Sequence, residues 1–435
     1  MTQPTFRLTP LRQAIRAGAA QTLPCLVTLT AEEANASDTP APHPPLNLAL
    51  VIDVSPSMAG DPIAQAREAA VMLIQRLAPT DRVALITYAT TAEVLMPSVL
   101  IGEARDEACR RLAAVTTREV STALHAGWLH GAQAIAPHVS AQITSRILLL
   151  SDGQANQGET NTNVLGEAAR HLLEETGITT STYGVGNQFN HTLMTLMGEC
   201  GGGQAFYATE AGELAGYFDT ELSLLTHSIA RQVSTQVTTP FDQSVIWVTG
   251  RPNASNEVRL GDLVAGATSW ALATVHLPAT LEHQTVELRG QASWTDNAGV
   301  QHQASVSVHL TLTDHEGAED PLVAERVRET EAARLQREAS EAVARGNIEG
   351  ARGMLRSMSA MAGSNAYVSS VTNQLNDLLD KGDAGVFQKE AYYAAHSMST
   401  RQVSNTEDTT VLSVDGLGLR KSVQGRSASS KENTP

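Results

Sequence analysis

Cysteine and basic residues are both scarce in this sequence of 435 residues. The three cysteines, Cys25, Cys109 and Cys200, lie far apart and form no Cys-x-x-Cys pair, which argues against a disulfide framework and a zinc knuckle. Lysine and arginine number 30 against 46 aspartate and glutamate residues, so the formal net charge is −16. This charge argues against broad binding to nucleic acids or anionic membranes, because either requires a basic protein face.

Long apolar runs are also missing. No segment approaches the roughly 18 uninterrupted apolar residues of a membrane-spanning helix. The first stretch, MTQPTFRLTPLRQAIRAG, lacks the apolar core of a secretory signal. We therefore expect a cytoplasmic protein without membrane contact. With 42% hydrophobic residues, a chain of this length can nevertheless bury the cores of two or three domains.

Short apolar runs alternate with segments of helical spacing between residues 46 and 230. LNLALVID, RVALITYA and SRILLLSD are almost continuously apolar, whereas DPIAQAREAAVMLIQRL repeats its apolar residues about once per helical turn. Such alternation predicts a doubly wound, mostly parallel α/β sheet that is covered by helices on both faces. The proline-rich stretch TPAPHPP, which ends at Pro45, marks a boundary before this domain.

Residues 231–315 change to a period of two, which predicts an antiparallel β-sandwich. The stretch ASVSVHLTLT places five apolar residues on one face, namely Ala304, Val306, Val308, Leu310 and Leu312. In the N-terminal segment, residues 1–45, the run Leu23–Thr30 is typical of a strand, and a strand without a neighbour leaves its backbone unpaired. We expect this strand to join the sandwich, so that the α/β domain is an insertion within it.

The last part of the chain has helical spacing and then loses all periodicity. Residues 316–397 predict helical hairpins that turn near Gly346 and Asn347. Residues 398–435 are rich in serine, threonine and glycine, so we expect a disordered tail. Thr409 and Thr410 follow an acidic pair and could serve as phosphorylation sites. The alternative is a tail that only keeps the protein in solution.

An acidic residue and two serines follow the first apolar strand of the α/β domain. In LNLALVIDVSPSMAG, Asp53 ends the strand, and Ser55 and Ser57 follow at alternate positions. Ligands of a doubly wound sheet bind beyond the carboxyl ends of its strands. A carboxylate and two hydroxyls suit a hard cation such as Mg²⁺, whereas zinc would favour histidine or cysteine ligands.

Two further polar residues follow the same logic. Asp152 ends the apolar run ILLLSD, and Thr122 lies in VSTALHAGW at the start of an expected helix. With these residues the segment from about Asn47 to Leu225 resembles the von Willebrand factor type A family, which has a Rossmann-like fold. The resemblance includes LVIDVSPSM, DRVALITYA, RILLLSDGQAN and TYGVGNQFN, phrases usual in bacterial members. It implies a metal-ion-dependent adhesion site formed by Asp53, Ser55, Ser57, Thr122 and Asp152.

The resemblance implies binding rather than catalysis. In the family, the metal ion keeps one position open for a carboxylate of a partner protein. We therefore expect an adaptor that uses Mg²⁺, with Mn²⁺ or Ca²⁺ as alternatives, to bind a glutamate or aspartate on another protein. Bacterial relatives often act beside AAA+ ATPases, kinases or phosphatases. Pro56 stands where the family usually has glycine, and it fixes the backbone of the loop.

Two alternatives belong to other classes. In one, the chain is a structural assembly module whose metal site is inert. In the other, Asp53 acts as the nucleophile of a phosphoryl-transfer enzyme. Ser55 occupies the position where haloacid-dehalogenase-type phosphatases carry a second aspartate, and no G-x-S-x-G motif surrounds either serine. These departures argue against an enzyme.

Overall fold

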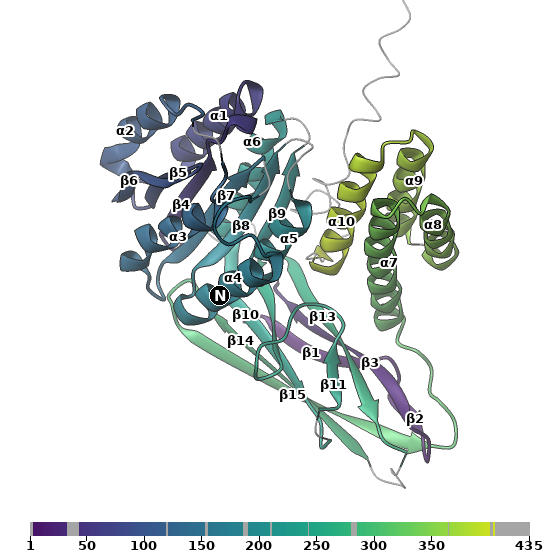
Figure 1. The fold of residues 1–435 in the computed structure, drawn as a ribbon. Coiled ribbons are helices and arrows are strands. Elements are labelled where there is room, and N and C mark those ends of the chain that lie inside the picture. The colour runs from purple at the N-terminus through teal and green to yellow at the C-terminus, as the bar shows by residue number, and fades with distance from the viewer. Residues whose placement is uncertain are drawn as a thin grey trace, which may run out of the picture.

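The computed structural model contains an α/β domain, a two-sheet β-sandwich and a helical region (Figure 1). The predicted fold class is confirmed: a doubly wound, mostly parallel sheet is inserted in an antiparallel sandwich and followed by helices. The structure describes residues 3–32, 43–118, 121–152, 155–185, 190–208, 211–241, 243–279, 285–363, 365–400 and 403–404.

The sheet of the α/β domain has the strand order β6-β5-β4-β7-β8-β9. Its strands are β4 (Leu46–Asp53), β5 (Arg82–Tyr88), β6 (Ala92–Leu100), β7 (Thr144–Ser151), β8 (Thr179–Val185) and β9 (Gly202–Ala208). Strand β6 pairs antiparallel with β5, and the other neighbours are parallel. Every residue of β4 and β7 is buried, as the apolar runs of both strands predicted.

Three helices cover each face of this sheet. Helices α1 (Asp61–Arg76), α2 (Ile101–Ala113) and α6 (Leu214–His227) pack on one face, and α3 (Leu124–Ile135), α4 (Thr162–Thr176) and α5 (His191–Cys200) pack on the other. Alternate residues of β4 point into the two cores, because side chains alternate along a strand: Leu50 and Ile52 face the first set of helices, and Val51 faces the second. Both faces of the central strands are therefore shielded from water.

The sandwich combines strands from both sides of the insertion. One sheet joins β1 (Thr5–Pro10), β3 (Gln21–Thr30), β13 (Ala267–Leu277), β11 (Val245–Trp247) and β16 (Val403–Ser404). The other joins β12 (Glu257–Val264), β10 (Ser228–Thr238), β14 (Val286–Thr295), β15 (Gln301–Thr313) and β2 (Ala14–Arg16). Strand β3, which contains the predicted strand Leu23–Thr30, pairs with β13 along its whole length. Trp247, Trp270 and Trp294 are buried on sandwich strands.

The helical region consists of α7 (Pro321–Ala344), α8 (Ile348–Ala362), α9 (Ala366–Asp380) and α10 (Ala384–Thr400). The four helices share one apolar core, to which α9 contributes Val371, Leu375 and Leu379. Helix α10 also packs against α5 and β9, so the helical region lies directly against the α/β domain (Figure 1).

Several elements go beyond the sequence-based expectations. The N-terminal segment contributes three strands rather than one, and β9 was not expected from its glycine-rich sequence. Helix α10 continues to Thr400, and β16 pairs with β13, so regular structure extends past the expected boundary at residue 397. Residues 405–435, with Thr409 and Thr410, lie outside the described residues.

Candidate functional site

The carboxyl ends of β4 and β7 bring two acidic residues to the same edge of the sheet. The two strands run parallel and in register, with Ile52 opposite Leu150. Asp53 is the last residue of β4, and Asp152 directly follows β7. Asp53 is fully buried, and Asp152 is 7% exposed. Two carboxylates from distant parts of the chain therefore lie beside each other below the surface.

Serine hydroxyls link these two carboxylates. The Oγ of Ser57 donates a hydrogen bond of 2.9 Å to Oδ1 of Asp152. The Oγ atoms of Ser55 and Ser57 lie 3.0 Å apart. Either hydroxyl could be the donor of this contact. The backbone N–H of Ser55 in turn donates to Oδ1 of Asp53 at 2.8 Å, so one continuous hydrogen-bonded chain runs from Asp53 to Asp152.

The loop between β4 and α1 holds the serines in this position. Residues Pro56–Met58 form a single 3₁₀ turn, closed by a hydrogen bond of 3.0 Å from the N–H of Met58 to the carbonyl of Ser55. Met58 is fully buried and anchors the loop in the core. Pro56 occupies the first position of the turn, where a fixed φ is compatible with the geometry and an N–H would have no partner within the turn. Proline therefore fits this loop without displacing either serine.

Thr122 reaches the same edge from a third loop. It is 4% exposed and lies two residues before α3. Its N–H donates to Oδ1 of Asn156 at 2.7 Å, and the N–H of Asn156 returns a bond of 3.2 Å to the carbonyl of Thr122. Asn156 belongs to the loop that follows Asp152, so this reciprocal pair ties the Thr122 loop to the end of β7. No hydrogen bond joins the Thr122 hydroxyl to the other four residues within the described part of the chain.

The two carboxylates lack a positive partner. Burial raises the pKa of Asp53, and hydrogen bonds from Ser55 and Ser151 only partly offset this rise. Burial, followed by the negative charge of Asp53, raises the pKa of Asp152 to about 6. Among the residues that the structure describes, neither carboxylate forms an ion pair, and the nearby Arg118 is paired with Glu93. Burial therefore has the largest influence on the pKa values of both acids at this edge.

Sequence reasoning missed the residues that support this edge. The hydroxyl of Ser151 donates to Oδ2 of Asp53 at 3.0 Å, and Asn156 holds the Thr122 loop. The buried hydroxyl of Tyr88 donates to the carbonyl of Leu150 at 3.0 Å. A hydroxyl beside an acid at a strand end, as in LLLSD, is a weak local signal for Ser151. No spacing rule identifies Asn156, because its partner lies 34 residues earlier.

Comparison with known proteins agrees with this architecture. Residues 47–220 match the model of the von Willebrand factor type A domain. An uncharacterized protein of Synechocystis sp. is 27% identical over 345 residues, a match that covers 73% of this chain and 79% of that protein. The ArnB paralog VWA2 of Sulfolobus acidocaldarius has a similar structure, with a TM-score of 0.63 at 14% identity, over 92% of this chain and 99% of that chain.

A von Willebrand factor type A structure from Catenulispora acidiphila has a TM-score of 0.67 at 18% identity, over 85% of this chain and 89% of that chain. At such identities these structures establish a shared fold. Because both matches cover most of the chain, the similarity extends beyond the α/β domain into the flanking parts. The match to the von Willebrand factor type A domain covers residues 47–220, which include all six strands of the α/β sheet apart from Leu46, the first residue of β4.

Proposed function

We propose that the α/β domain is a metal-dependent protein-binding module. In this proposal Asp53, Ser55, Ser57, Thr122 and Asp152 hold a Mg²⁺ ion, and an aspartate or glutamate of a partner protein binds at the same place. The hydrogen-bonded chain from Asp53 to Asp152 carries the proposal, because it gathers two carboxylates and two hydroxyls without a cation of the protein's own.

The donor atoms fit a hard cation. All five side chains present oxygen, which Mg²⁺ prefers, and neither histidine nor cysteine is part of the set. Within the described residues, no group of three or more histidine, cysteine, aspartate or glutamate side chains is placed to hold a metal ion. The proposed site therefore depends on hydroxyls together with only two acids. Mn²⁺ and Ca²⁺ are the alternative ions for the same donors.

Few negative ligands favour an anionic partner. Serine and threonine hydroxyls are neutral ligands, so a Mg²⁺ ion held largely by them would keep enough positive charge on its open side to attract a further carboxylate. Ser57 is exposed, so this edge of the sheet is open to an approaching side chain. The buried Asp53 and Asp152 stay fixed by their hydrogen bonds, which means that little ordering is needed before a partner binds. The role is binding without turnover.

The partner class follows from the family and from charge. We propose a protein that presents a glutamate or aspartate, within a system such as an AAA+ ATPase, a kinase or a phosphatase. The formal charge of −16 disfavours nucleic acid as the partner. In the described part of the chain, no helix combines the length and apolar character needed to cross a membrane. We place the interaction in the cytoplasm, where free thiols such as those of Cys25, Cys109 and Cys200 persist.

Metal binding is tested first, without any partner. Calorimetric titration with Mg²⁺ should yield a single site on the wild-type protein. At a Mg²⁺ concentration of about 100 times Kd, the free energy of unfolding should rise by about 2.7 kcal/mol. Asp152→Ala should abolish both effects. Asp106→Ala removes an exposed carboxylate from α2 and should preserve both. Equal Mg²⁺ binding by wild type and Asp152→Ala would contradict the assignment of the site.

Partner binding is tested next. Proteins from the native cells that co-purify with the wild-type chain should be lost after chelation and in the Asp53→Ala variant. They should return when Mg²⁺ is added back to the wild type. If the same partners remain under all these conditions, the chain is a structural assembly module with an inert metal site.

A further inference from the structure

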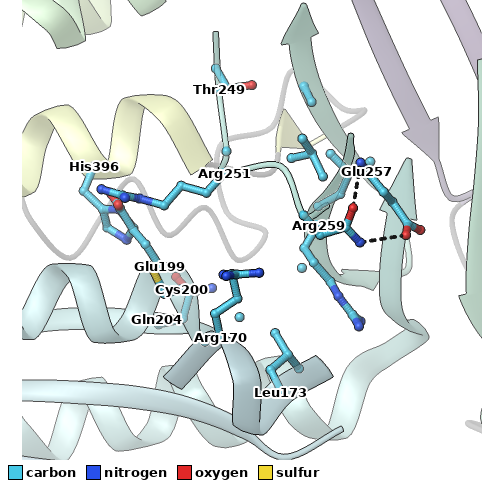
Figure 2. Close-up of a pocket in the computed structure, with 18 of the residues that line it drawn as sticks. Arg170, Leu173, Glu199, Cys200, Gln204, Thr249, Arg251, Glu257, Arg259 and His396 are labelled. Atoms are coloured by element: carbon cyan, nitrogen blue, oxygen red, sulfur yellow. Dashed lines mark hydrogen bonds and ion pairs between the residues drawn. The ribbon is translucent and has the colours of Figure 1, made fainter. Parts of the chain in front are cut away.

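A second binding site lies where the α/β domain, the sandwich and the helical region meet. A pocket of about 370 Å³ opens there (Figure 2). Its walls come from α4, α5 and β9, from the segment Val248–Leu260 with β13, and from α7 and α10. None of the five proposed metal ligands lines this pocket.

Four arginines converge on the pocket. Arg170 extends from α4, Arg251 from the segment between β11 and β12, Arg259 from β12, and Arg337 from α7. Figure 2 shows Arg170, Arg251 and Arg259 entering from different sides of the pocket. These four guanidinium groups lie in a chain whose formal net charge is −16.

The carboxylates of the pocket are already engaged within the chain. Glu174 accepts a bond of 2.9 Å from Arg170, which also pairs with Glu167 on the same helix. Glu199 accepts a bond of 2.8 Å from Nδ1 of His396 and lies 3.8 Å from Arg337. Glu257 accepts hydrogen bonds from Ser234 and Asn253. Each of these acids therefore has a partner within the chain, and among the described residues none of them forms an ion pair with Arg251 or Arg259.

Arg251 and Arg259 are less closely engaged than Arg170 and Arg337. Both side chains are exposed, and among the described residues neither lies within 4 Å of a carboxylate oxygen. Arg259 makes only a long contact of 3.4 Å to the carbonyl of Gln232. Arg251 reaches toward Glu199 and His396 (Figure 2). Burial alone would raise the pKa of Glu199, but the His396 hydrogen bond and the charges of His396, Arg337 and Arg251 hold it below its ordinary value.

The wall of the pocket adds an unused donor and an apolar surface. Trp270 is 6% exposed, and its Nε1 has no hydrogen-bond acceptor among the residues that the structure describes. Leu173, Val248 and Ala271 supply apolar lining. The volume lies within the range of small-molecule sites and exceeds what a bare inorganic anion fills. A ligand for this site is thus rich in acceptors, negatively charged, and joined to an organic body.

From these observations we infer that the pocket binds a small organic phosphate. Guanidinium groups bind phosphate oxygens with paired, charge-assisted hydrogen bonds, and Arg251 and Arg259 have that capacity unused. The phosphate lies between these two arginines, and the organic body lies along the apolar lining. Because all three parts of the chain form the walls, an occupied pocket also stabilises their packing. This site is independent of metal and partner binding at the sheet edge.

Calorimetric titration at constant ionic strength tests this proposal, with inorganic phosphate, glucose 6-phosphate and glucose as probes. Both phosphates should bind and raise the thermal midpoint, glucose 6-phosphate more strongly, and glucose should do neither. Arg251→Gln and Arg259→Gln should each weaken phosphate binding about tenfold, and the double variant should abolish it. Arg259→Lys, which keeps the charge, should retain part of the affinity.

Arg7→Gln is the matched control, because Arg7 is an exposed arginine on β1 outside the pocket. It should bind both phosphates like the wild type. Removal of metal with a chelator should leave phosphate binding unchanged, which separates this outcome from that of the proposed function. The proposal is overturned if neither phosphate binds at millimolar concentrations, or if the double variant binds as well as Arg7→Gln. Citrate binding as tightly as glucose 6-phosphate would overturn the phosphate assignment.

Discussion

Strand β7 has a pair of carboxylates near each of its two ends, and the two pairs are stabilised in different ways. Near its start, Arg146 forms ion pairs with Glu221 of α6 at 2.6 Å and with Asp262 of β12 at 2.9 Å. Beyond its end, the described residues join Asp152 and Asp53 through hydroxyl and amide groups alone. An arginine therefore bridges one acid pair, whereas no basic side chain in the described part of the chain pairs with the other.

The arginine-containing end is a structural junction. Side-chain exposure is 4% for Arg146, 1% for Glu221 and 14% for Asp262. Burial alone would lower the pKa of Arg146, but Glu221 and Asp262 together raise it, so the guanidinium stays charged. Asp262 also accepts a bond of 3.0 Å from the N–H of Gln232. This network fixes the sandwich to the base of the α/β domain.

The two ends of β7 differ in whether the chain supplies a positive charge for the acids. Buried charges are tolerated in proteins when they are paired with opposite charges or bind metals. At the start of β7 the chain supplies the pairing from its own sequence. At the end of β7 the described residues supply none, and the pKa of Asp152 is raised as a result. In the proposed function, a cation from solution supplies the missing positive charge at this end.

Removal of Arg146 should produce the largest change in stability. Arg146→Met removes both ion pairs and leaves the charge of Glu221 buried, so the free energy of unfolding should fall by about 3–5 kcal/mol. Urea denaturation measures the change. Arg289→Met is the control, because Arg289 forms an exposed ion pair with Glu287 and its loss should cost less than about 1 kcal/mol. Equal effects of the two substitutions would show that the buried network adds no stability.

At the carboxyl end of β7, a substitution of Asp152 should raise the free energy of unfolding, by less than the loss of Arg146 lowers it. The folded-state pKa of Asp152 is about 6, above the ordinary 3.8, so its contribution to stability is full below pH 3.8 and is lost as the pH rises through about 6. In metal-free protein, Asp152→Asn removes this loss but keeps an oxygen for the Ser57 hydrogen bond. The variant should be more stable than wild type by about 2 kcal/mol at pH 7 and nearly equal at pH 4.

Urea denaturation across this pH range, with a chelator present, measures the difference between the two proteins. Addition of Mg²⁺ should reverse the order at pH 7, because only the wild type keeps the full set of proposed ligands. A difference that does not change with pH would mean that Asp152 is already stabilised as an anion without metal.

The sequence predicted the fold class because buried parallel strands require continuous apolar runs. LNLALVID and SRILLLSD therefore identified the two central strands, and the acids that follow them identified one edge of the sheet. Strands β1 and β9 lacked such signals. β1 contains Arg7 and Pro10, and β9 begins with two glycines and lies at the edge of its sheet, where local sequence is weakly constrained.

The supporting contacts of both sites could not be predicted because they depend on tertiary packing. Ser151 donates to Asp53 across 98 positions, and Arg146 meets Asp262 across 116. Periodicity describes the neighbourhood of a residue within one helix or strand and carries no information at these separations. The arginine pocket is a further case, since its walls come from three separately packed parts of the chain.

The smallest effect concerns Pro56, the residue at which this chain departs from its family's usual glycine. The 3₁₀ turn at Pro56–Met58 closes with proline at its first position, and Ser55 and Ser57 still reach each other at 3.0 Å. Proline at a compatible position stabilises a protein by restricting the unfolded chain. Pro56→Gly should therefore lower the free energy of unfolding by about 0.5–1 kcal/mol and leave Mg²⁺ affinity within about twofold, because the hydroxyls keep their places.

Pro56→Ala separates the two causes of that change. Alanine restores an N–H, but it gives the unfolded chain less conformational freedom than glycine does. Pro56→Ala should therefore lower the free energy of unfolding by less than Pro56→Gly does. Chemical denaturation and Mg²⁺ titration of the three proteins measure both quantities. If glycine instead tightened Mg²⁺ binding tenfold while alanine did not, proline would be holding the loop away from its metal-binding geometry. The hydrogen bond from Ser57 to Asp152, which already forms with Pro56 in place, argues for the first outcome.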